Sequence, residues 1–159
     1  MVGPVLLDWF RRAITAMVDE AERGHGAVVE RRSAVARLAA GDATEKPFES
    51  SLVGALHHLP KPSPDSLELT NELVAISHAL PWTPSARVDD GGNGVGLVDL
   101  LECIDIELAG AGLMFLAPGA GYPEHQHHPA EVYLVLHGAR RWPGRVCLSG
   151  PGRRNRWAR

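Results

Sequence analysis

The sequence predicts an α+β protein in which helices come first and an antiparallel β-sheet follows. In the first 80 residues, apolar side chains recur at three- and four-residue steps, which is the period of an amphipathic helix. After Gly96 the period changes to two, and short apolar segments alternate with turn residues, which is typical of a sandwich or barrel. We therefore expect a helical region over 1–85, a β domain over 86–143 and an Arg-rich irregular tail over 144–159.

The N-terminal region carries three predicted helices before residue 60. The first covers 5–21 and carries an apolar stripe, and a stripe of this kind packs a core rather than binding a cofactor. A second, weaker helix is expected over 27–40, where Gly41 ends it, and a short third helix around 52–56. The stripe consists of Val5, Leu6, Trp9, Phe10, Ala13, Ile14 and Met17.

A further helix is predicted after Ser63. Ser63 is a suitable N-cap, Pro64 fits the first helical position, and Asp65 places an acid in the first turn. Pro81 ends this helix. Its apolar side carries Leu69, Leu73, Ile76 and Leu80.

Strands are predicted in the second half of the chain. Residues 86–96 are dense in Gly, Asp and Asn and predict a loop. Alternation over 98–108 predicts one extended strand, and 113–116 form a second strand between glycines and a Pro-Gly turn. Residues 131–137, rich in Val, Tyr and Leu, predict a third strand, which Gly138 ends.

Bulk properties restrict the class of protein. The two cysteines are far apart, so neither a disulfide framework nor a Cys-rich zinc site is indicated. No apolar run approaches the roughly 20 residues that cross a bilayer. The first residues lack the basic start and cleavage site of a signal peptide. We therefore expect a cytoplasmic protein without a membrane partner.

The charge is unevenly distributed. Seven of the 16 basic residues lie in 139–159, a stretch without Asp or Glu. The nine others accompany 19 acidic residues in 1–138, a net charge of −10 there. Such a switch is typical either of a nucleic-acid-binding tail or of a sequence that was never selected to fold.

The segment from Tyr122 to Tyr133 carries the chemistry. Side chains two apart on a strand face the same way, so His125 and His127 are expected to point together. Glu131 opens the returning strand after a proline and can face both imidazoles. Two imidazoles and a carboxylate form a facial triad that holds divalent Fe, Zn, Mn or Ni with positions left open.

The neighbouring histidines and tyrosines receive separate interpretations. His128 has the opposite parity to the pair, so we expect a turn residue there. Tyr122 and Tyr133, the only tyrosines, both flank the motif. A phenol beside a metal can have its pKa lowered and act as a general base, while an aromatic residue filling a barrel mouth remains an equal alternative.

The motif as a whole resembles a known family. The spacing His125-x-His127-x3-Glu131-x6-Gly138 is similar to the first metal motif of cupins, and the flanking tyrosines narrow the resemblance to cupin-type dimethylsulfoniopropionate (DMSP) lyases. It covers about residues 50–142. The resemblance implies an N-terminal helical region before an antiparallel cupin (double-stranded β-helix) barrel.

The resemblance also implies an activity. DMSP would be cleaved to dimethyl sulfide and acrylate by β-elimination at a metal, with Tyr122 removing the α-proton and Tyr133 touching metal or substrate. An aromatic such as Trp82 would face the sulfonium cation. The resemblance implies that the chain binds a small-molecule substrate and does not bind nucleic acid.

One departure from the family pattern is evident. Family members supply a fourth metal ligand, a histidine in a second motif, whereas this chain has no histidine after His137. We expect a barrel that is incomplete at its C-terminal end through truncation or frameshift, with open strand edges that favour a homodimer or aggregation. The alternatives to a lyase are a non-catalytic cupin that binds metal or small ligands, and an inactive remnant.

Overall fold

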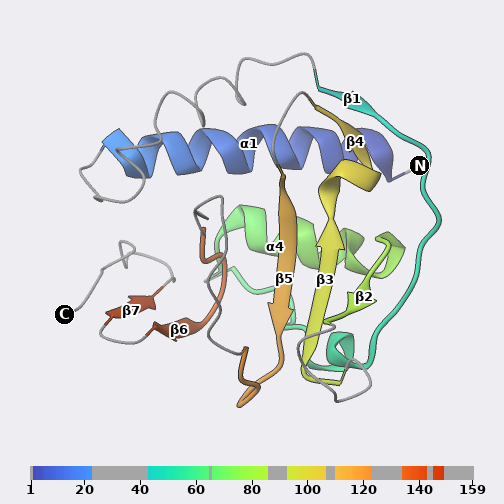
Figure 1. Cartoon of the computed structure of the whole chain (residues 1–159). Coiled ribbons are helices and arrows are strands. Elements are labelled where there is room, and N and C mark those ends of the chain that lie inside the picture. The colour runs from blue at the N-terminus through green and yellow to red at the C-terminus, as the bar shows by residue number, and fades with distance from the viewer. Residues whose placement is uncertain are drawn as a thin grey trace.

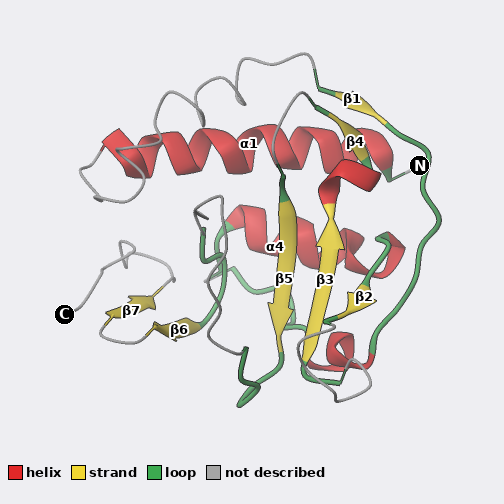
Figure 2. Cartoon of the chain, in the orientation of Figure 1, coloured by secondary structure: helices red, strands yellow, loops and turns green. Residues whose placement is uncertain are grey.

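The computed structural model describes residues 2–22, 43–64, 66–85, 93–106, 110–122, 134–142 and 145–148 (Figures 1 and 2). In chain order the elements are α1 (Gly3–Glu22), β1 (Thr44–Glu45), the 3₁₀ helix η1 (Gly54–His58), α4 (Glu68–Ile76), η2 (Ser77–Ala79), β2 (Thr83–Pro84), β3 (Val95–Asp99), η3 (Leu100–Glu102), β4 (Ile104–Asp105), β5 (Gly112–Leu116), β6 (Ala139–Trp142) and β7 (Arg145–Leu148).

Helix α1 confirms the first predicted stripe. Leu6 is fully buried, and Trp9 and Phe10 are 2% and 3% exposed, so the stripe faces the core as its period requires. Val5, at the margin of the stripe, is 48% exposed and does not belong to it. The helix predicted over 27–40 lies outside the described residues, while η1 agrees with the short helix expected nearby.

The start of α4 differs from the prediction. The helix begins at Glu68 with Leu67 at the N-cap and no side-chain cap, so Ser63 is not the cap. The reason is a competing pairing: the side-chain amide of Asn71 bonds both the N–H and the carbonyl of Ser63, at 3.0 and 2.8 Å. This fixes Ser63 in a turn ahead of the helix. The apolar side is confirmed, with Leu80 fully buried.

A three-stranded antiparallel sheet of order β2-β3-β5 lies in front of α4 in Figure 1. Val98 pairs with Leu113. Val98 belongs to the buried core cluster to which α1 contributes, and Leu113 packs against it, as do the apolar side chains of α4. The neighbouring pair, Leu97 and Met114, has the opposite parity and faces away from the helices. One sheet face therefore packs on α1 and α4, which together form the helical layer, and the other face is turned away from it.

The single strand predicted over 98–108 is wrong. β3 ends at Asp99, and the turn of η3 separates it from β4. The carboxylate of Asp99 accepts a hydrogen bond from the N–H of Leu101 at 2.9 Å, which turns the chain although the apolar alternation continues. β5 matches the predicted second strand and adds only Gly112.

The core joins both halves of the described chain. β1 pairs with β4 next to the N-terminal end of α1, and Ile104 of β4 is 1% exposed within the same cluster as Leu6 and Trp9. The boundary expected at residue 85 stays a prediction. Side chains from both of its sides nevertheless share one apolar cluster.

After the segment from Tyr122 to Tyr133, called the motif segment below, the chain forms a hairpin. Residues 134–138 contain no strand, although a strand was predicted to run through 137, and Gly138 turns the chain with φ of 78°. β6 and β7 then pair antiparallel. Within the tail expected from residue 144, residues 145–148 form the strand β7.

The fold class is confirmed at the level of a mixed protein, with an N-terminal helix followed by antiparallel sheets. Within the described ranges the strands form three small sheets and no closed barrel. Among the helices described there, none is long and apolar enough to span a bilayer.

Candidate active site

A β-turn connects β5 to the motif segment. Residues 117–120 form a β-turn, closed by a 2.9 Å hydrogen bond from the N–H of Ala120 to the carbonyl of Ala117. Gly119 adopts φ of 81° at the position where such a turn requires glycine. The turn follows β5 directly and delivers Tyr122, which is half-buried.

Most of the predicted site lies outside the described residues. This applies to His125, His127, Glu131 and Tyr133, and their assignment as metal ligands and as a catalytic residue stays a prediction. In the part of the chain that the structure does describe, no three His, Cys, Asp or Glu side chains come together as a metal site.

The segment that follows the motif is held against the helical layer. Leu134 and Leu136 are half-buried and pack on the core cluster. The hydroxyl of Thr70 in α4 donates a 2.6 Å hydrogen bond to the carbonyl of Leu136. The sequence did not indicate this contact. The available signal was a polar residue inside the apolar side of α4, directly after Leu69.

Trp82 lies inside the core. Trp82 is only 3% exposed, and its indole N–H donates a 2.7 Å hydrogen bond to the carbonyl of Ser77. A Cβ on Gly96 would approach the ring within 3.0 Å, so the indole rests on the sheet face that packs on the helices. These contacts give Trp82 a packing role. Its contact with a sulfonium cation stays a prediction.

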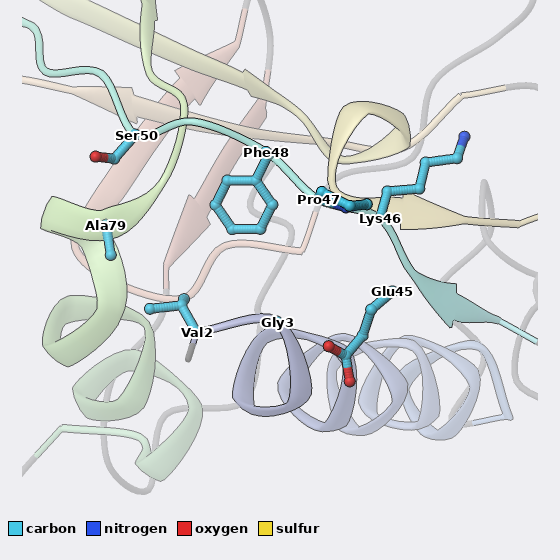
Figure 3. Close-up of a pocket in the computed structure, with 8 residues that line it drawn as sticks. All are labelled: Val2, Gly3, Glu45, Lys46, Pro47, Phe48, Ser50 and Ala79. Atoms are coloured by element: carbon cyan, nitrogen blue, oxygen red, sulfur yellow. The ribbon is translucent and has the colours of Figure 1, made fainter.

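An open hollow of about 470 Å³ lies at the N-terminal end of α1, lined by apolar groups that include Phe48 (Figure 3). The Glu45 carboxylate is directed at the first turn of the helix, next to Gly3, where it interacts favourably with the helix dipole. Lys46 points away and bonds Asp105 at 3.3 Å. The charged groups of the hollow are thus engaged in the fold, and no predicted site residue lines it.

The comparisons with known proteins decide the family. A family model for dimethylsulfoniopropionate lyase matches residues 24–146, more than half of the chain. The chain belongs to this family. Neither the curated proteins nor the solved structures give a match.

Membership in the DMSP lyase family indicates a lyase and suggests DMSP cleavage. The matched range contains the whole motif segment, from Tyr122 to Tyr133, and both of its described flanks. It also contains β6 and the first two residues of β7, and it ends at residue 146.

Proposed function

We propose that this chain is a metal-dependent carbon–sulfur lyase that cleaves DMSP to dimethyl sulfide and acrylate. One observation carries the proposal: the DMSP lyase match over residues 24–146 includes His125-x-His127-x3-Glu131 together with Tyr122. The spacing alone is typical of a metal site, and the family supplies the substrate class.

We further propose that the sheet is part of a cupin barrel. The pairs Leu97–Met114 and Val95–Leu116 lie on the face turned away from the helices. Val95 is fully buried, although it is not a member of the core cluster on the helical side. An apolar second face is what the interior of a barrel requires, and it supports this interpretation.

The donor set fits a divalent transition metal. His125, His127 and Glu131 would hold the ion with two neutral imidazoles and an ionised carboxylate, protonation states that are accessible near neutral pH. When bound, the ion supplies Lewis acidity that polarises the substrate carboxylate and acidifies the adjacent α-hydrogen.

The residues of the chain carry out the proton transfer. Tyr122 removes the α-proton of DMSP through its phenolic oxygen, and the electron pair of the broken C–H bond forms the double bond of acrylate. The bond between the β-carbon and sulfur breaks, and dimethyl sulfide leaves with its electron pair. Tyr122 then returns the proton to water. Tyr133, on the face expected for Glu131, orients the substrate.

The first prediction tests this activity. The full chain, loaded in turn with Fe²⁺, Zn²⁺, Mn²⁺ and Ni²⁺, is expected to release dimethyl sulfide and acrylate in equal amounts from DMSP. Dimethyl sulfide is measured by headspace gas chromatography. Tyr122→Phe should lower kcat by roughly 100-fold or more, because it removes the general base.

Two adjacent histidines provide a matched control. His127→Ala should lose both the bound metal and the release of dimethyl sulfide, whereas His128→Ala should retain both, because its parity directs it away from the ligands. Absence of dimethyl sulfide above background from metal-loaded wild-type protein would overturn the proposed function.

A further inference from the structure

The hydroxyl of Thr70 makes an unusual contact for a residue on a helix. Thr15 and Ser77 donate to the carbonyl four residues earlier, in Arg11 and Leu73, as helical hydroxyls commonly do. Thr70 instead donates across 66 residues to the carbonyl of Leu136. Thr70 is 4% exposed, so the bond is shielded from competing water.

The acceptor lies directly after the metal motif. Leu136 follows Glu131 by five positions, and Leu134 and Leu136 both pack on the core cluster. These two leucines and the carbonyl bonded by Thr70 hold the described chain directly after Tyr133 against α1 and α4.

Helix α4 provides a rigid support for this contact. On one side of Thr70, the carbonyl of Leu69 accepts a 2.8 Å hydrogen bond from the indole of Trp9. On the other side, Glu72 forms a two-point ion pair with Arg12 of α1, and its hydrogen bonds raise the pKa of the guanidinium above its ordinary value. Thr70 therefore lies between two anchors to α1.

The other end of the motif segment is also attached. The N–H of Ala117, at the end of β5, donates a 2.8 Å hydrogen bond to the carbonyl of Gly94 ahead of β3. The segment from Tyr122 to Leu134 is thus delimited by a contact to the sheet on one side and by the contact to α4 on the other.

We infer that Thr70 is a positioning residue of the metal site, a role that rests on the proposed function. Its hydroxyl fixes the carbonyl of Leu136 against α4, five positions after Glu131, and so holds the C-terminal flank of the metal motif in place. Metal ligands lose affinity when the groups that orient them are removed. Thr70 thereby couples the helical region to the motif without touching metal or substrate.

The test compares two deletions of a buried hydroxyl in the full chain. Thr70→Val removes the long-range bond, and Ser77→Ala removes a local bond of the same 2.6 Å length in the adjoining turn. Thr70→Ser retains the hydroxyl. Affinities are measured by titration with Zn²⁺ and by the absorption of bound Co²⁺.

We expect Thr70→Val to weaken metal binding roughly 10-fold, and Thr70→Ser and Ser77→Ala to stay within about twofold of wild type. Hydrogen exchange should accelerate at residues 134–138 in Thr70→Val alone. Wild-type affinity in Thr70→Val overturns the inference, and so does an equal loss in Ser77→Ala, which would indicate a general loss of stability.

Failure of the proposed function is distinguishable from failure of this inference. Wild-type protein that binds no metal contradicts the proposed function, and the positioning role falls with it. Metal binding by the wild type together with unchanged exchange at residues 134–138 in Thr70→Val contradicts only the role of Thr70.

Discussion

Cys103 illustrates how burial controls the chemistry of a single residue. It is 1% exposed, and burial raises the pKa of its thiol from 9.0 to about 11, with smaller contributions from Glu102 and Asp99. The thiolate is the reactive form of cysteine. Cys103 is therefore a packing residue and a weak nucleophile at neutral pH.

The raised pKa predicts a loss of stability in alkali. Below pH 9 the thiol is protonated in both the folded and the unfolded chain. As the pH rises from 9.0 through about 11, the unfolded thiol ionises while the folded one keeps its proton, so unfolding becomes more favourable. Urea midpoints at about pH 8 and about pH 10.5 should fall further in wild type than in Cys103→Ala. Equal falls in both proteins would contradict the assignment.

At the scale of elements, α1 forms one wall of the core through side chains on a single face. Leu6 is fully buried, whereas its neighbour Val5 is 48% exposed. Ile104 of β4 belongs to the same cluster, so α1 packs against the strand β4 as well as against α4. The family match begins at residue 24, after α1 has ended at Glu22. The wall thus lies outside the matched range.

Adjacent residues of α1 provide a sharp test. Leu6→Ala should lower the free energy of unfolding by about 2–5 kcal/mol, because it leaves a cavity in the core. Val5→Ala should change it by less than about 0.5 kcal/mol, because its side chain is largely in solvent. Chemical denaturation followed by circular dichroism measures both. Similar losses in the two variants would mean that the stripe is not the packed face.

Periodicity predicted the parts of the fold that local sequence determines. The stripe of α1 and the strand β5 follow from residue spacing alone. Side-chain hydrogen bonds caused the errors: Asp99 turns the chain at Leu101, and Asn71 ties Ser63 into a turn. Both compete with the regular structure that the apolar pattern indicates.

The candidate site was predictable in the same uneven way. The spacing of His125, His127 and Glu131 identifies donor atoms from the sequence alone. The bond from Thr70 to Leu136 joins residues 66 positions apart, and no local pattern encodes such a pair. Residue types therefore indicate the chemistry, whereas the supporting contacts require the folded chain.

At the scale of the whole molecule, the described core is continuous. Residues from α1, β3, η3 and β4 belong to one apolar cluster, which crosses the boundary expected at residue 85, and the apolar side of α4 packs against it. Neither side of that boundary keeps its buried face covered without the other. The helical layer and the sheet therefore depend on each other for stability.

This shared core predicts a single cooperative unfolding transition. In urea, the loss of helix seen by far-UV circular dichroism should coincide with the change in tryptophan fluorescence, to which the buried Trp9 contributes from α1 and Trp82 from its contact with Gly96 of the sheet. A fluorescence transition clearly separated from the loss of helix would indicate two independent units.

The long-range contacts of α1 and α4 have a consequence for synthesis on the ribosome. Trp9 bonds Leu69 across 60 residues, and Thr70 bonds Leu136 across 66. At translation rates of roughly 5–20 residues per second, the segment that each helix bonds is synthesised on the order of several seconds after the helix itself. During that interval the apolar stripe of α1 is without its final cover, so side chains that are buried in the folded protein stay accessible until the later part of the chain has been made.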